Sequence, residues 1–147
     1  MHRVTKTWGH DFGLSVCFRQ WRASSHCHLT HGYALAISVE FEAKQLDPHG
    51  WVIDFGGLRG FTDQLRALFD HKTVVAADDP ALDWFKEGQR RGLVELVTLP
   101  AVGCEAFAEV VCELAKDWLQ AHGHERRVRV VSATVREHGA NSASYCP

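Results

Sequence analysis

Residues 33–42 of the chain read YALAISVEFE. Large apolar side chains occupy every second position, and small or polar side chains stand between them. This period of two is typical of a strand that buries one face and leaves the other face open. The segment therefore predicts the central strand of a sheet, and the elements around it decide the fold.

We expect a partner strand before it, within residues 12–22, and a turn at residues 47–50 followed by a short extended piece at 51–55. Apolar residues at helical spacing predict one helix from about Leu58 to Asp70 and a second over about 107–118, which Gly123 closes. The charged residues 86–91 indicate a solvated surface element. Residues 127–137 alternate again and predict the last long strand, and the tail after it offers a fourth strand.

This order of elements favours an α+β fold: an antiparallel four-stranded sheet with two helices packed on one face. Such a sheet leaves its other face and its edges uncovered, which predicts oligomerisation. With 147 residues and 46% hydrophobic composition, the chain has the size and core of a single domain spanning 1–147.

The composition also bounds the function. A net charge of -2 provides no basic surface, so we expect no nucleic-acid partner and favour a small ligand. No apolar run approaches the roughly 20 residues that cross a bilayer, so we expect no membrane partner and a cytoplasmic protein. Five scattered cysteines, an odd number, indicate free thiols rather than a disulfide framework.

The stretch just before the central strand, residues 25–33, reads SHCHLTHGY and holds three histidines and a cysteine within six residues. Imidazole and thiol groups both bind soft divalent metals and both move protons near neutral pH. From the residues alone, a metal site, a proton-transfer site and a merely polar loop all remain open.

Five different sequence features follow one another along the chain. They are Cys27 separated by three residues from His31-Gly32, the segment GWVIDF at 50–55, Asp70-His71 at the end of the first helix, Glu105 at the start of the second, and Glu137 at the end of the last strand. From about residue 12 to residue 145 the chain resembles the 6-pyruvoyl-tetrahydropterin synthase and 6-carboxy-tetrahydropterin synthase family. The resemblance implies a tunnelling fold, in which sheets join edge to edge into a barrel, and a homohexamer or other homo-oligomer with sites at subunit interfaces.

The resemblance also implies a lyase acting on a dihydropterin such as dihydroneopterin triphosphate. Cys27 matches the family's cysteine base, and Asp70 and His71 match an aspartate-histidine pair that usually comes from a neighbouring subunit. A thiol of ordinary pKa, about 8.5, needs such a cationic or hydrogen-bonding partner to act as a base near neutral pH. For Asp70-His71 the plain alternative is a polar helix end.

Three further residues match the family's substrate-binding positions. Glu137 matches the glutamate that anchors the pterin ring, because a carboxylate accepts two parallel hydrogen bonds from a guanidine-like edge. Glu105 resembles the acid at the start of the second helix, and Cys104 precedes it where the family has threonine or serine. The alternative for Glu137 is an ordinary polar residue at a strand end. The alternative for Glu105 is an acid that helix electrostatics alone favours at a helix N-terminus.

The metal positions depart from the family, whose zinc is held by one histidine on the first strand and by a His-any-His pair on the second. His31 matches one ligand, whereas Phe18 and Tyr33 stand at the other two positions. Catalytic zinc needs about three protein ligands, so His31 alone cannot hold it. Either His26 and His28 rebuild a zinc site with His31, or His10 or His138 reaches in from elsewhere, or the metal is lost.

Three functions follow. The first is the lyase with its cysteine base, for which loss of zinc would favour a retro-aldol cleavage or an epimerisation. The second is an altered or inactive pterin- or purine-binding protein without zinc, and the third is metal storage or sensing by the histidine cluster. The sequence leaves open whether the pathway makes a pterin cofactor or a queuosine-type precursor.

Overall fold

The sheet is built on strand β3 (His31–Ala43), which at 13 residues is the longest strand in the computed structural model of residues 1–147. On one edge, β3 pairs first with β2 (Leu14–Phe18) and then with β1 (His2–Trp8). On its other edge it pairs with β6 (Val128–His138). The alternation at residues 33–42 correctly predicts this strand, and its apolar positions from Leu35 onward are buried.

Three more strands extend the sheet. They are β4 (Lys72–Ala76), β5 (Leu96–Leu99) and β7 (Asn141–Tyr145), which give the order β5-β4-β2-β3-β6-β7 with β1 beside β3. β4 runs parallel to β2, and β5 runs parallel to β4. The prediction of a purely antiparallel four-stranded sheet is therefore wrong, since the sheet is mixed and has seven strands. β4 escaped prediction because four of its five residues are buried, so it shows no alternation.

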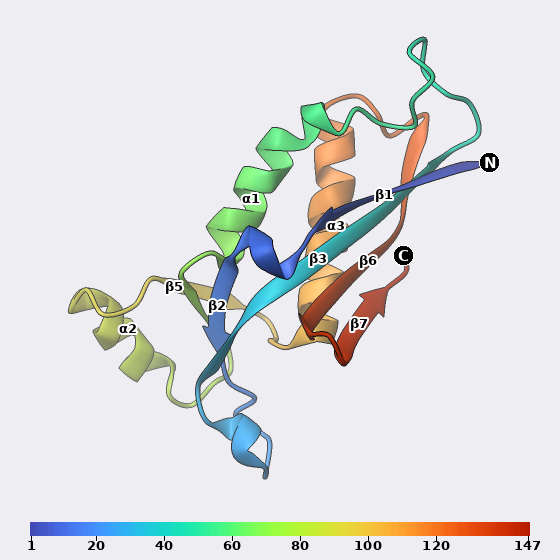
Figure 1. The fold of residues 1–147 in the computed structure, drawn as a ribbon. Coiled ribbons are helices and arrows are strands. Elements are labelled where there is room, and N and C mark those ends of the chain that lie inside the picture. The colour runs from blue at the N-terminus through green and yellow to red at the C-terminus, as the bar shows by residue number, and fades with distance from the viewer.

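Helices α1 (Arg59–Phe69) and α3 (Cys104–Ala121) pack on one face of the sheet and close the main core, as predicted (Figure 1). A third helix, α2 (Leu82–Arg90), packs against β4 and β5. Its Phe85 and the β4 residue Val75 are buried outside the main core, and Val75 points away from its core neighbours Val74 and Ala76. The helices therefore cover both faces of the sheet at the edge formed by β4 and β5. The prediction that two helices pack on one face only is also wrong.

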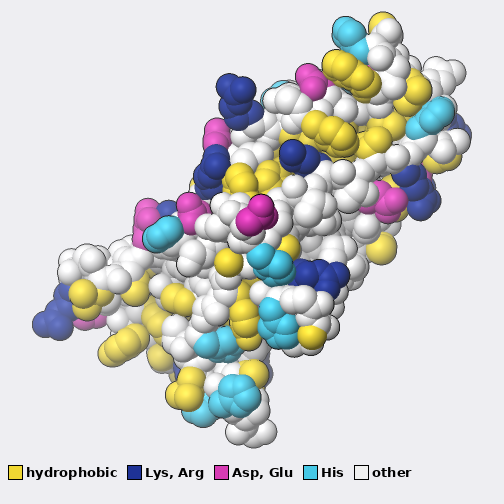
Figure 2. Space-filling model, viewed as in Figure 1, with side chains coloured by type: hydrophobic (Ala, Val, Ile, Leu, Met, Phe, Trp, Pro, Cys, Tyr) yellow, Lys and Arg dark blue, Asp and Glu magenta, His cyan; other side chains and the backbone are white.

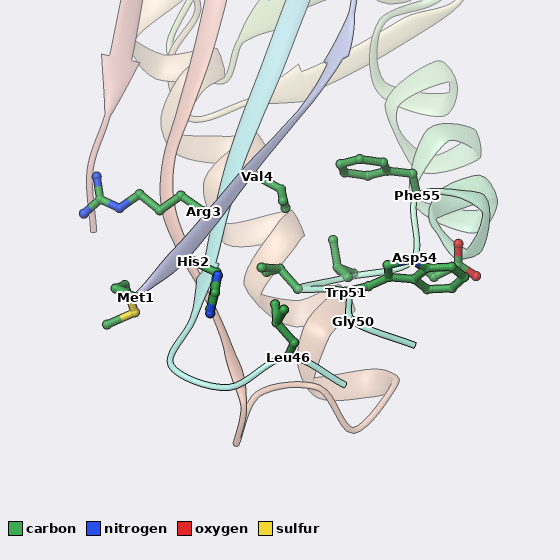
Figure 3. Close-up of a pocket in the computed structure, with 11 residues that line it drawn as sticks. Met1, His2, Arg3, Val4, Leu46, Gly50, Trp51, Asp54 and Phe55 are labelled. Atoms are coloured by element: carbon green, nitrogen blue, oxygen red, sulfur yellow. The ribbon is translucent and has the colours of Figure 1, made fainter. Parts of the chain in front are cut away.

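The charged segment 86–91 falls mostly within α2 and is largely exposed, as a solvated element should be. Residues 51–55 form no strand, although Val52 and Ile53 are buried. With the start of β1 this segment lines a hollow of about 650 Å³, in which Phe55 and Leu46 lie on opposite sides (Figure 3). None of the helices is long and apolar enough to cross a membrane.

Arg19, directly after β2, fixes the loop that carries the histidine cluster. Its guanidinium donates to both carboxylate oxygens of Asp79, at 2.9 and 2.7 Å, and to the carbonyl of His28 at 3.2 Å. Asp79 is only 4% exposed and also accepts a hydrogen bond from the backbone N–H of Ala81 at 2.8 Å. The hydrogen bond from Arg19 lowers the pKa of Asp79 despite the opposing effect of burial. The pair ties the loop to the turn before α2.

We predict that Asp79→Asn destabilises the fold by about 1–3 kcal/mol at pH 7, because it removes a charge-assisted hydrogen-bond acceptor from a buried site. A carboxyl with a depressed folded-state pKa stabilises above its unfolded pKa of about 4, and this contribution is lost as the pH falls through the folded value. In urea denaturation the difference in the free energy of unfolding between wild type and variant should thus be largest at pH 7 and should decrease at lower pH. Substitution of an exposed aspartate, Asp117→Asn, is the control. A difference in unfolding free energy that stays constant with pH would contradict stabilisation by the ionised Asp79 carboxylate.

Candidate functional site

Three aromatic side chains meet at the end of the sheet where β2 finishes and β3 begins. Ring centroids lie 5.3 Å apart for Phe18 and His31, 6.1 Å for Phe18 and Tyr33, and 5.5 Å for His31 and Tyr33. Strand alternation puts all three on the face that α1 and α3 cover, and Phe18 packs edge-on against Phe107 of α3 at 5.1 Å. We call Phe18, His31 and Tyr33 the aromatic triad. The resemblance described above assigns the family's three zinc-ligand positions to these residues.

Three ionisable groups act electrostatically on Tyr33 of the triad: Glu137, Cys27 and Cys104. Glu137, near the end of β6, lies on the same face as the buried Val135, and Cys104 opens α3. Burial, and then the charges of Glu137 and Glu105, raise the pKa of Cys104 to about 12. We use the name Tyr33 pocket for Tyr33, Cys27, Cys104 and Glu137.

The pKa of the Tyr33 phenol is shifted by all three other members of the Tyr33 pocket. Burial raises the pKa of Tyr33, and the charges of Glu137, Cys27 and Cys104 raise it further. These four residues come from the loop after β2, the start of β3, the start of α3 and the end of β6. Sequence reasoning had assigned three of them separately, and the structure brings them together around the fourth.

The start of α3 is held against the loop after β2 by the side chain of Gln20. The Gln20 side-chain amide donates to the carbonyl of Val102 at 2.7 Å. A Cβ on Gly103 would lie 2.2 Å from the same amide nitrogen, and Gly103 has a φ of 112°, which other residues rarely adopt. Glycine at this position therefore lets Cys104 and the helix start reach the Tyr33 pocket.

Cys27 lies in a short 3-10 turn, η2 (His26–His28), and is half-buried. The Ser25 hydroxyl accepts from the Cys27 backbone N–H at 3.4 Å, and the Cys27 carbonyl accepts from the backbone N–H of Gln20 at 2.9 Å. Backbone contacts on both sides of the turn hold the cysteine in place. The loop that carries the Cys27 thiol is thus ordered by hydrogen bonds of its backbone.

The Asp70-His71 pair lies elsewhere on the chain. The His71 Nδ1 and the Asp70 carboxylate are 2.7 Å apart, the imidazole is 82% exposed, and His71 adopts a φ of 57°. His71 shares a hollow of about 490 Å³ with Cys17, Thr73 and Tyr33, and the thiol of Cys17 lies 3.2 Å from the hydroxyl of Thr73. No hydrogen bond joins the pair to Cys27 within one chain. The structure therefore leaves the predicted Cys27, Asp70 and His71 set divided.

Glu105 is exposed in the first turn of α3. Its charge contributes to the raised pKa of Cys104, so it lies near the entrance to the Tyr33 pocket. Tyr33 itself was singled out from sequence only as a missing histidine. A tyrosine where the resemblance expects a histidine ligand is the one signal that could have marked residue 33 as a member of the site.

The side chains present do not fit the family's three-histidine zinc site. Histidines gather at this end of the molecule, where η2 and the start of β3 lie (Figures 1 and 2). However, no group of three or more His, Cys, Asp or Glu side chains is arranged to hold a metal ion, so His26, His28 and His31 do not form a ligand set. His28 and His31 instead use Nδ1 to bond the carbonyls of Ser25 and Leu29, at 2.6 and 2.7 Å.

We predict that restoring two imidazoles creates a zinc site. The double variant Phe18→His/Tyr33→His should bind about one zinc ion per chain through these residues and His31, because the triad already brings the three positions together. Metal content after dialysis against trace zinc measures the effect. Adding His31→Ala to the double variant is the matched control and should abolish binding. A folded double variant without zinc would show that the triad does not occupy the ligand positions.

Comparison with known proteins supports the architecture. The family model described as 6-pyruvoyl tetrahydropterin synthase matches residues 7–147. No curated protein matches the chain.

Three solved structures are similar in fold over nearly their whole length. An uncharacterized protein of Wolinella succinogenes matches 99% of this chain and 97% of its own, with a TM-score of 0.81 and 21% identity. A 6-pyruvoyltetrahydropterin synthase of Plasmodium vivax carrying a catalytic-residue mutation matches 99% and 98%, with a TM-score of 0.69 and 14% identity. The 6-pyruvoyl tetrahydropterin synthase of Caenorhabditis elegans matches 99% and 94%, with a TM-score of 0.62 and 16% identity. By its family-model match, the chain belongs to the 6-pyruvoyl tetrahydropterin synthase family.

Proposed function

We propose that the chain is a dihydropterin lyase that cleaves the side chain of its substrate by proton transfer, with Cys27 as the base. The observation that supports this proposal is that Cys27, Cys104 and Glu137 all raise the pKa of Tyr33, which with Phe18 stands at a position where the resemblance expects a zinc ligand. Thiol and carboxylate are thus retained where metal ligands are replaced. This combination favours acid-base chemistry over chemistry that needs a bound cation.

Glu137 is the proposed anchor of the pterin ring. A pterin presents an amino group and a ring N–H side by side, and one carboxylate accepts both. The neighbouring Cys104 thiol, with its pKa of about 12, stays protonated and adds no second negative charge at neutral pH. The half-buried rings of His31 and Tyr33 offer aromatic surface beside the flat ligand.

The proposed reaction is a retro-aldol cleavage. The Cys27 thiolate takes the proton of a side-chain hydroxyl, and the bond between that carbon and the carbon next to the ring breaks. The hydroxyl carbon leaves as an aldehyde. The electron pair stays on the carbon next to the ring, is delocalised into the ring's C=N bond, and finally takes up a proton. The triphosphate elimination of the family's synthases would also need an electrophile at the side-chain oxygens, which zinc provides elsewhere.

Activation of Cys27 is assigned to Asp70 and His71 of a neighbouring subunit in a homo-oligomer. The imidazole of His71 is 82% exposed and makes no hydrogen bond to Cys27 within one chain, and both observations support a partner in trans. A second copy could dock along the free edges of the sheet at β5 and β7. His71, oriented by Asp70, would then supply the cationic partner that a thiolate base needs.

The second candidate is a pterin- or purine-binding protein without turnover. The presence of Phe18 and Tyr33 at ligand positions favours it, because both changes remove metal ligands. Binding of a dihydropterin in calorimetry, with no product by chromatography, would select this candidate over the lyase.

We predict that Cys27→Ala lowers turnover of dihydroneopterin or its triphosphate about 100-fold or more, because general-base catalysis typically contributes 10²–10⁴. Aldehyde release and the shortened pterin, followed by chromatography, are the readouts. The exposed Cys146→Ala is the matched control and should keep full turnover. Unchanged turnover in Cys27→Ala would remove the cysteine from the mechanism.

We also predict that Glu137→Gln weakens pterin binding about 10- to 100-fold, which corresponds to the roughly 1.5–3 kcal/mol of a charge-assisted hydrogen bond. Calorimetric titration with neopterin measures the dissociation constant without turnover. Glu105→Gln tests a nearby carboxylate that is exposed and should change the constant far less. Equal effects of the two substitutions would contradict Glu137 as the specific ring anchor.

A further inference from the structure

A hollow of about 630 Å³ lies where β3 ends and β6 begins, at the end of the sheet away from the Tyr33 pocket. The charged side chains that line it are Glu42, Lys44, Glu125, Arg126, Arg127 and Arg129. Most of these side chains are basic, although the whole chain has a net charge of -2. The hollow therefore gathers positive charge against the overall balance of the chain.

Three charged side chains stand side by side on neighbouring strands at this end of the sheet. Arg3 of β1 and Arg129 of β6 lie directly opposite Glu42 of β3 in the two strand pairings. Both arginines donate to the Glu42 carboxylate, Arg3 through Nε at 2.8 Å, and the Glu42 side chain has no exposed surface. Burial disfavours the charged form of Glu42, but the hydrogen bonds from Arg129 and Arg3 outweigh burial and lower the pKa. Two guanidinium groups thus share one ionised carboxylate, which leaves positive charge in excess.

Three further basic side chains line the hollow and form no ion pair. Lys44 and Arg126 are exposed, and the ion pairs beside them are made by Arg3 and Arg129. Arg127 is half-buried, and its Nη1 donates to the carbonyls of Gln45 and Trp51 at 3.3 and 3.2 Å. These two bonds fix the guanidinium of Arg127 and leave its Nε and Nη2 groups for a ligand.

Two acidic side chains near these cations do not cancel them. Glu125 is exposed and forms no ion pair. Asp47 already accepts from the backbone N–H groups of His49 and Trp51, both at 2.9 Å. These bonds lower the pKa of Asp47 despite burial, and the charge of Arg127 contributes less. The hollow keeps an excess of positive charge.

We propose that this hollow binds a small molecule that carries a diphosphate or triphosphate group. Guanidinium groups bind phosphate oxygens through parallel hydrogen bonds, and an ammonium group adds a point charge. A chain of two or three phosphates carries several negative charges, which suits the cations of Lys44, Arg126 and Arg127. The volume falls within the roughly 300–1,000 Å³ of small-molecule sites. The proposal does not rest on the lyase function.

The hollow is separate from the proposed reaction site within one chain. The start of β1, the end of β3 and the start of β6 lie together at one end of the sheet (Figure 1). Tyr33 lies near the other end of β3, and the extended strand from Tyr33 to Glu42 spans about 30 Å. One dihydropterin triphosphate is shorter than this distance. The hollow therefore takes a second molecule.

Calorimetric titration with sodium tripolyphosphate at low salt tests the proposal. Lys44→Gln/Arg126→Gln removes two exposed charges, so it should weaken binding about tenfold or more and keep the melting temperature near that of wild type. Arg59→Gln/Lys86→Gln is the matched control, because it makes the same change in net charge at exposed positions of α1 and α2. The control should change the dissociation constant less than about twofold, since salt screens distant charges.

A substitution of opposite sign gives a second test. Glu125→Gln removes a negative charge from the lining of the hollow and should strengthen tripolyphosphate binding about two- to fivefold. Glu109→Gln, an exposed acid on α3, is the control and should leave binding unchanged. Weaker or unchanged binding in Glu125→Gln would contradict an anion in this hollow.

Comparison of ATP with tripolyphosphate separates a phosphate ester from the free phosphate chain. Tighter binding of ATP shows that the hollow also contacts the organic part of the ligand. Equal binding shows that it recognises the phosphate chain alone. Either result, together with the loss in Lys44→Gln/Arg126→Gln, supports the proposal.

Other results overturn the proposal. One is a wild-type protein that binds neither tripolyphosphate nor ATP, and another is a control double variant that weakens binding as much as Lys44→Gln/Arg126→Gln. Tighter binding of a single-stranded oligonucleotide than of tripolyphosphate would assign the surface to nucleic acid instead. Loss of dihydropterin turnover in Lys44→Gln/Arg126→Gln would make the hollow part of the reaction site. If the wild type binds tripolyphosphate but cleaves no dihydropterin, the lyase proposal fails and this one stands.

Discussion

The strict alternation of side chains along β3 is the constraint on which the structure depends. One face of this strand contributes Leu35, Ile37 and Val39 to the core, and two residues earlier the same face contributes Tyr33 to the site. A shift of one residue in the pairing with β2 would turn both sets to the opposite face. The core and the Tyr33 pocket are therefore held in place by the same register.

Elements with a clear hydrophobic period could be predicted from the sequence, and elements without one could not. β3, α1, α3 and β6 each repeat apolar residues over three or more periods, so their type was evident. β4 is buried on both faces and β5 has only four residues, so neither carries a readable pattern. β1 pairs with residues far along the chain and has one buried position, which leaves little local signal. The parallel pairing of β4 follows from tertiary packing.

The candidate site was predictable where chemistry is carried by the residue type itself. Cys27, Cys104 and Glu137 were identified by their order along the chain, and in the structure the charges of all three act on Tyr33, although their roles stay proposals. The surroundings of the exposed Asp70-His71 pair could not be predicted, because His71 lines a hollow with Cys17 and Tyr33, which lie far from it along the chain. The Arg19–Asp79 pair was also hidden, since 60 residues separate its members.

The two thiols of the Tyr33 pocket differ in a way that bears on oxidation. Peroxides attack thiolates, and the Cys104 thiol, with a pKa of about 12, is almost entirely protonated in neutral solution. The residue beside the ring anchor is therefore shielded from sulfenic acid formation, whereas Cys27 sits in a half-buried loop turn. Under oxidative stress the proposed enzyme would lose its base before its ring-binding end. It would persist as a protein that still captures pterins and no longer cleaves them.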